Sequence, residues 1–239
     1  MSVPGSPIAP KPPRRRHHGD LRRALVLAGL EAIEELGVAA LTIRGLARRL
    51  GVSHAAPAHH FPDKLALLSA VASEGFRRFE TALREEARAG ATPRQRMQRI
   101  GRAYVRFALD HPATFRVMFG RELADCSQAT SELQQASASA YAVLQETAEA
   151  AAGSREAGEV HAFAGWALVH GAALLYLDGA LRPRLPADSA GRAAFEELVD
   201  AVLSRGPPAV RRGSGGRAQK REAEANGPPP RRLPRKRAS

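Results

Sequence analysis

Apolar residues recur at helical spacing in successive segments between residues 20 and 204, and short stretches containing Gly or Pro separate these segments. The first segment predicts a helix over residues 20–36 that Gly37 ends. The apolar side of this helix consists of Leu21, Leu25, Ala28 and Ala32. Aromatic residues make up only 5% of the chain, so the core must be built mainly from Leu, Ala and Val. Both features favour an all-α fold.

Residues 41–68 carry the most informative pattern. Thr42 is expected to cap a short helix, and Gly51 to end it, because glycine adopts a left-handed backbone without steric cost. Ser53 is expected to cap a second short helix that runs towards Phe61. Two short helices joined by a glycine turn form a helix-turn-helix, whose second helix can lie in the major groove of DNA. The apolar face of the first helix consists of Ile43, Leu46, Ala47 and Leu50.

The rest of the chain predicts a helical bundle that follows this three-helix head. A long helix from Asp63 to about Ala89 leaves the head, and its length would link the head to the bundle. A later helix, over residues 157–181, is apolar on more than one face and therefore needs burial on more than one side. A symmetric four-helix interface between two copies of the chain would supply that burial. The remaining helices are expected over residues 93–110, just after 112, over 127–152 and from about 189.

The net charge of +12 is concentrated at the two ends of the chain. Residues 1–18 contain four basic residues and no acid, and residues 205–239 contain eleven basic residues and two acids, so residues 19–204 carry −1. Both ends are also rich in Pro or Gly, and we expect them to be a disordered basic arm and a disordered basic tail. The single cysteine, Cys126, excludes an intrachain disulfide and fits a reducing cytoplasm.

The head segment resembles the TetR family of bacterial transcriptional repressors. The matching positions are Thr42, Ile43, Leu46, Ala47, Leu50, Gly51, Val52, Ser53, His60, Phe61, Lys64, Leu67 and Leu68. One position departs from the family pattern, since Ala58 stands where a tyrosine usually reaches a phosphate oxygen. The resemblance implies a cytoplasmic, nucleoid-associated homodimer that binds a palindromic operator in double-stranded DNA. It also implies release by a small effector, here expected to be apolar or amphipathic.

The contact candidates for DNA lie in and around the predicted second helix. Thr42 and Lys64 are expected to bind phosphates. His54, Ala55 and Ala56 are expected to meet base edges, where alanine methyl groups suit the methyl group of thymine. The sequence has no cysteine near His54, His59 and His60, so a metal site is not expected. The full set of candidates is Thr42, Arg44, Ser53, His54, Ala55, Ala56, His59, His60 and Lys64.

A second resemblance covers about residues 90–204. Trp166, followed by His170-Gly171, and the upstream run of residues 115–119 are similar to a TetR C-terminal domain type named for its Trp-His-Gly signature. The side chains that could line an effector cavity there could equally be plain core, and His170 could be a hydrogen-bonded core histidine. These cavity candidates are Tyr104, Phe107, Phe115, Met118, Trp166 and His170.

The predicted domains are an arm over residues 1–18, a helix-turn-helix domain over 19–64 with its linking helix to about 89, an effector-binding and dimerisation domain over 90–204, and a tail over 205–239. No cofactor and no membrane span are expected. The chain shows no nucleophile elbow, glycine-rich phosphate loop or metalloprotease motif, so an enzyme is not expected. A DNA-binding protein that relies on its basic tails and has little sequence preference stays open as an alternative, as does an enzyme that uses the helical cavity.

Overall fold

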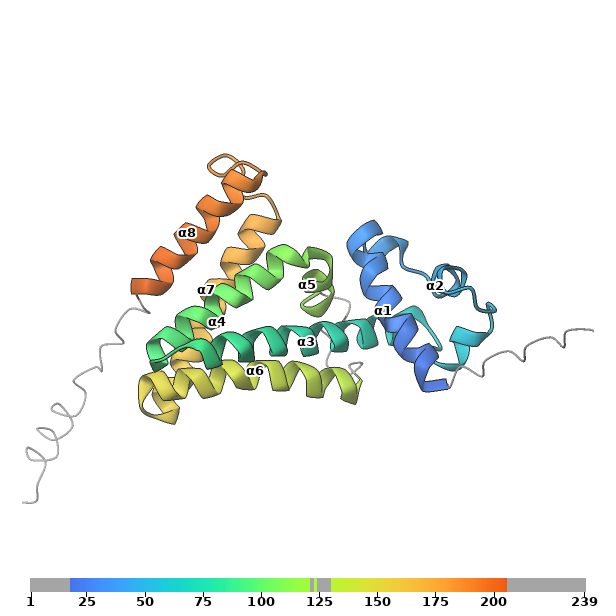
Figure 1. Ribbon diagram of the computed structural model, residues 1–239, viewed down its shortest axis with the longest axis horizontal. Helices are drawn as coiled ribbons and strands as arrows, with labels where there is room; N and C mark the ends of the chain where they lie inside the picture. Colours follow the sequence, from blue (N-terminus) through green and yellow to red (C-terminus); the bar gives the residue numbers. More distant parts are fainter. Residues whose placement is uncertain (1–17, 121–122, 124–129, 206–239) are drawn as a thin grey trace, which may run out of the picture. The chain divides into compact units, whose positions relative to one another are not determined.

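The computed structural model describes residues 18–120, 123 and 130–205 (Figure 1). Eight α-helices and two short 3-10 helices account for most of this part of the chain, and it contains no strand. The predicted all-α fold is therefore confirmed. Residues 1–17, residues 206–239 and Cys126 lie outside the described residues, so the predicted arm and tail stay predictions.

The head contains α1, η1, α2 and η2, together with the first turns of α3. The bounds are α1 His18–Leu36, η1 Val38–Ala40, α2 Ile43–Arg49 and η2 Ala56–His59. The body contains the rest of the helices, with bounds α3 Lys64–Ala89, α4 Pro93–Asp110, α5 Pro112–Met118, α6 Ser131–Ala152, α7 Arg155–Leu177 and α8 Ser189–Arg205.

Local sequence sets most helix ends. The Asp63 side chain accepts a hydrogen bond from the Ala66 N–H at 2.8 Å and caps α3, as the sequence predicts. Thr92 and Gln95 form a reciprocal capping box at the start of α4, and Pro93 occupies the first helical position between them. Gly153 ends α6 with φ +75°, a left-handed conformation that favours glycine.

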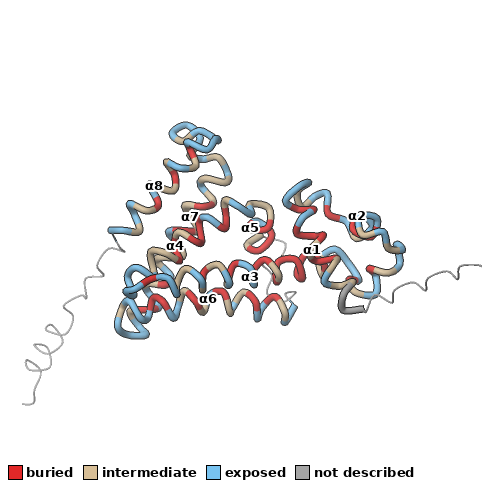
Figure 2. The backbone as a smooth tube through the Cα atoms, in the orientation of Figure 1, coloured by how far each residue is buried: buried red, intermediate tan, exposed pale blue. Residues whose placement is uncertain are grey.

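The central helix of the fold is α3, which packs against α1, α4, α5 and α6. Its first half is almost fully buried, as the red segment of α3 in Figure 2 shows. One apolar core joins Ile33 of α1 to Val71 of α3 and to Phe115 of α5, so it continues from the head into the body. The predicted boundary between the two functional domains therefore falls within a continuous helix and a continuous core, and it stays a prediction.

The last two helices leave much apolar surface exposed. Phe163 of α7 is 65% exposed and Leu198 of α8 is 56% exposed. By length and composition alone, α7 could cross a membrane, with a mean hydropathy of 1.4. Only 17% of its most apolar stretch is buried, so α7 is not an ordinary core helix of the single chain. Ser154 caps this helix, which begins at Arg155, two residues before the predicted start, and ends at Leu177 rather than Leu181. Within the described part of the chain, no other element covers these apolar side chains.

Candidate DNA-binding surface and apolar cavity

The turn after α2 is built as the sequence predicts. The Thr42 hydroxyl accepts a hydrogen bond from the Gly45 N–H at 3.0 Å, which caps the first turn of α2. At the other end, Gly51 has φ +63°. The Val52 N–H donates to the Ala47 carbonyl at 3.0 Å and closes the turn. Leu46 and Ala47 face the core, so the polar face of α2 points outwards.

The second helix of the predicted pair is shorter than expected. Residues 53–61 were predicted to form a helix capped by the Ser53 side chain, and the structure instead has the 3-10 helix η2 with Ala55 at its cap and no side-chain cap bond. Pro57 explains the difference. It has no N–H to donate to the carbonyl four residues back, and its ring disfavours the α region for the residue before it. Pro57 and Phe61 are buried and fix η2 against the head.

The segment that would enter the major groove presents most of its side chains to solvent. Ser53, His54, Ala55 and His59 are exposed, whereas Ala56 and His60 are half-buried. The six predicted contact residues of this segment thus lie together, on the turn before η2, on η2 itself and at its end.

The flanking side chains differ in whether hydrogen bonds or ion pairs within the chain already engage them. Thr42 and Arg44 are exposed at the start of α2, although the Thr42 hydroxyl already serves as a cap. The Lys64 ammonium donates to the Val38 carbonyl at 3.1 Å and is exposed. The nearby Arg49 is paired with Glu35 at 2.7 Å and with Glu31 at 3.2 Å. The hydrogen bond to Glu35 raises the pKa of Arg49, so the charge is permanent but is already engaged by two carboxylates.

An apolar cavity of about 580 Å³ lies in the body, walled mainly by side chains of α3, α4, α6 and α7, with Met118 of α5 and Leu203 of α8 also contributing. Tyr104, Met118 and Trp166 line it. Phe107, Phe115 and His170 lie outside its wall, and the structure brings Phe115 and His170 against Tyr104, with ring centroids 5.7 Å and 6.2 Å from the tyrosine ring. The cavity wall thus contains three of the six candidates.

Sequence reasoning missed most of the other wall residues. They come from helices whose apolar faces fit a filled core equally well, and no signal in the sequence separates a cavity wall from a filled core. The largest of them are Phe76, Phe79, Leu83, Met97, Ile100, Phe119, Tyr141 and Leu144.

One polar cluster stands at the cavity wall. The Tyr104 hydroxyl lies 2.7 Å from His170 Nδ1 and accepts a hydrogen bond from Trp166 Nε1 at 3.3 Å. Burial raises the pKa of Tyr104 well above its ordinary value, and burial lowers the pKa of His170. Both groups are therefore neutral at neutral pH.

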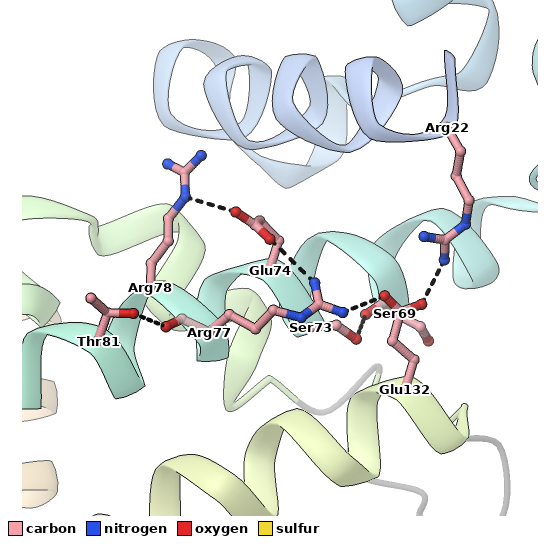
Figure 3. A network of polar contacts seen from close by, with 8 residues as sticks. All are labelled: Arg22, Ser69, Ser73, Glu74, Arg77, Arg78, Thr81 and Glu132. Carbon is pink, nitrogen blue, oxygen red and sulfur yellow. Dashed lines mark hydrogen bonds and ion pairs between the residues drawn. The ribbon is translucent and has the colours of Figure 1, made fainter. Parts of the chain in front are cut away.

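Two contacts tie the head to the body. Glu132 of α6 pairs with Arg22 of α1 at 2.6 Å and with Arg77 of α3 at 2.5 Å (Figure 3). Burial acts to raise the pKa of Glu132, but the hydrogen bonds from the two arginines outweigh it and lower the pKa overall. On the other side, the Glu34 carboxylate of α1 accepts hydrogen bonds from two backbone N–H groups at the start of α5, at 2.8 Å and 3.1 Å.

A three-helix head with a glycine turn and an exposed second element, followed by a helical body with an apolar cavity, defines a helix-turn-helix transcription regulator. Residues 25–71 match the family described as bacterial regulatory proteins, tetR family, and residues 97–202 match the tetracyclin repressor-like C-terminal domain. The chain belongs to the TetR family of DNA-binding transcriptional regulators. This is a family of regulators and not of enzymes.

Individual relatives agree with this assignment. The HTH-type transcriptional regulator BetI of Stenotrophomonas maltophilia is 35% identical over 80 residues, a match that spans 33% of this chain and 41% of BetI. A protein of unknown function from Rhodococcus sp. RHA1 is 34% identical, with a TM-score of 0.61 over 79% of this chain and 98% of that one. A TetR/AcrR regulator from Thermobifida fusca shares the fold at 17% identity, with a TM-score of 0.57 over 81% of this chain and all of that one.

Proposed function

We propose that the protein is a cytoplasmic, homodimeric repressor that a small apolar or amphipathic effector releases from a palindromic operator. The observation that carries this proposal is the course of α3. This helix begins at Lys64 in the head, and further along it contributes Phe76, Phe79 and Leu83 to the cavity wall. A molecule that reshapes the cavity would therefore act on the helix that supports the DNA-binding head.

The segment 53–60 reads the DNA in this proposal. His54, Ala55 and Ala56 meet base edges, and His59 and His60 meet base edges or phosphates. The support is that His54, Ala55 and His59 are exposed on a segment that the buried Pro57 and Phe61 fix in place, with Ala56 and His60 half-buried beside them. Thr42 and Lys64 bind phosphates and position the head, and Arg44 and Ser53 are further DNA contacts.

Dimerisation occurs through α7 and α8, which form a four-helix interface with the same helices of a second copy. The support is their exposed apolar side chains, which a symmetric partner would bury without any other protein. The exposed large apolar residues on these helices are Val160, Phe163, Leu168, Leu175, Leu198 and Val202. Two heads held in this way would meet half-sites about one helical turn of DNA apart.

The ties between head and body carry the effector signal. Glu132 holds α1 and α3 through one carboxylate, and Glu34 holds the start of α5. A shift of α3 or α5 at the cavity would therefore have to move α1 or break one of these contacts.

We also infer that the body is of the Trp-His-Gly type, because Trp166 and His170 meet at the Tyr104 hydroxyl.

A second function, sequence-tolerant DNA binding driven by the tails, is favoured by the +9 charge of residues 205–239. Removal of residues 1–18 and 206–239 separates the two functions. A repressor keeps its half-site preference after this truncation, and a tail-driven binder loses its DNA affinity.

The reading segment is tested with the double variant His54→Ala plus His59→Ala. Loss of the base-edge contact of His54 and of the base-edge or phosphate contact of His59 should weaken operator binding by about 10-fold to 1000-fold, and non-specific binding by much less. His111→Ala, which removes an exposed histidine of the body, is the matched control and should bind as the parent does. Unchanged operator affinity in the double variant contradicts the assigned reading segment.

A further inference from the structure

The cavity wall carries almost no polar group and no charge. Among the described residues, its side chains include no carboxylate, ammonium or guanidinium group. Its polar side-chain groups belong to Ser137, to the two tyrosines Tyr104 and Tyr141, and to Trp166. A charged ligand buried here would lose its hydration without gaining a partner, which costs several kcal/mol.

The Tyr104 hydroxyl has one hydrogen-bonding position left over. A phenol oxygen offers one proton and two lone pairs, and Trp166 Nε1 uses one lone pair because an indole N–H only donates. His170 Nδ1 uses a second position, either by accepting the phenol proton or by donating its own. In the first case a lone pair remains for the ligand, and in the second case the phenol proton remains.

His170 supplies no charge that would alter this selection. Its ring is packed among aromatic rings, with centroids 4.9 Å from Phe119, 5.6 Å from Phe115 and 5.9 Å from Trp166. Burial also lowers the pKa of His170, which keeps the imidazole neutral. The polar cluster is therefore a neutral hydrogen-bonding point in an apolar wall.

We propose that the cavity selects an uncharged, largely apolar molecule that carries a single hydrogen-bonding group, and that the Tyr104 hydroxyl binds this group by a hydrogen bond. The inference rests on the proposed function only in calling this molecule the effector. Ligand selection itself is a property of the cavity and can be measured without DNA.

The sequence provides the reporter for this measurement. Trp166 is the only tryptophan in the chain and lines the cavity, so tryptophan fluorescence reports on occupation of this one site. The probes are four eight-carbon compounds: octan-1-ol, 1-chlorooctane, octanoate and octyltrimethylammonium. At pH 7.5 octan-1-ol should bind at least about 10-fold more tightly than either ion, because the ions find no counter-charge.

The variant Tyr104→Phe removes only the hydroxyl. It should weaken binding of octan-1-ol by about fivefold, the worth of one neutral hydrogen bond, and leave binding of 1-chlorooctane unchanged. Tyr176→Phe makes the same chemical change on a ring stacked against Phe195, away from the cavity wall, and should alter neither affinity.

Three outcomes overturn the inference. The first is no fluorescence response to octan-1-ol, and the second is an ion that binds as tightly as the alcohol. The third is an equal loss of affinity for octan-1-ol and 1-chlorooctane in Tyr104→Phe, which would make Tyr104 a packing residue. Operator binding is measured separately with octan-1-ol present. Selective binding of the alcohol that leaves operator affinity unchanged supports the ligand selection and contradicts effector control in the proposed function.

Discussion

Replacing Phe163 by Ser should break the proposed dimer without unfolding the chain. Phe163 lies on α7 and is 65% exposed, so its side chain contributes little to the core of a single chain. Substitutions at such positions usually change the free energy of unfolding by less than about 0.5 kcal/mol. Any large effect of the change must therefore come from what covers this face.

The size of the effect follows from the exposed area. A phenylalanine side chain has about 200 Å² of surface, of which about 130 Å² is free here, worth about 3 kcal/mol if fully buried. Both copies lose this contribution, so about 6 kcal/mol is an upper limit for the loss in the free energy of dimerisation. Part of this is offset by relaxation and by ordering of side chains, and we expect a loss of at least about 2 kcal/mol, which raises the dimer Kd about 30-fold or more.

Sedimentation equilibrium over a range of protein concentrations measures this shift directly. The matched control is Leu36→Ser, because Leu36 of α1 is also 65% exposed but belongs to the head. The control should dimerise as the parent does. If Phe163→Ser dimerises with unchanged Kd, or if Leu36→Ser is equally affected, α7 is not the dimer interface.

Two further substitutions test local physical claims. Gly51→Ala should lower the free energy of unfolding by about 1 kcal/mol, because no atom lies within 4 Å of the added Cβ and only the backbone at φ +63° resists it. Gly51→Asn should cost less, and equal urea midpoints for the two variants would contradict this reasoning. Glu132→Gln should lower stability at pH 7 by less than about 1 kcal/mol, since the ion pairs it loses are partly exposed. The pKa of Glu132 is lowered from 4.5, so the unfolded chain binds its proton first and the stabilisation is lost as pH falls below about 4.5. The difference between parent and variant should vanish at low pH, and a difference that persists there would contradict the role of the charge.

Much of the helical fold could be predicted because local chemistry sets the helix ends. Asp63 as a cap, Gly51 as a left-handed stop and Pro93 in a first turn are each visible in the sequence and each appear in the structure. The prediction failed at η2, where Ser53 was expected to cap a regular helix and the chain forms a 3-10 helix at Pro57. A proline within a short helix removes a backbone hydrogen bond, which a cap residue alone does not offset.

The cavity could be predicted only in part. Tyr104 and Trp166 were candidates, but Phe79 and Leu83 have the same helical spacing whether a cavity or a filled core lies beside them. The tie of Glu132 to Arg22 joins residues 110 apart, and no pattern in the sequence signals it. Contacts of this kind depend on how the helices pack, which periodicity does not determine.

Selection of bound sequences from random duplex DNA, with the purified full-length protein at physiological salt, tests the central claim most directly. The account predicts enrichment of one palindrome whose half-sites are about one helical turn apart. It also predicts that a chain lacking residues 1–18 and 206–239 recovers the same palindrome. Failure to enrich any sequence, or enrichment that disappears with the tails, would contradict a specific dimeric reader and favour tail-driven binding.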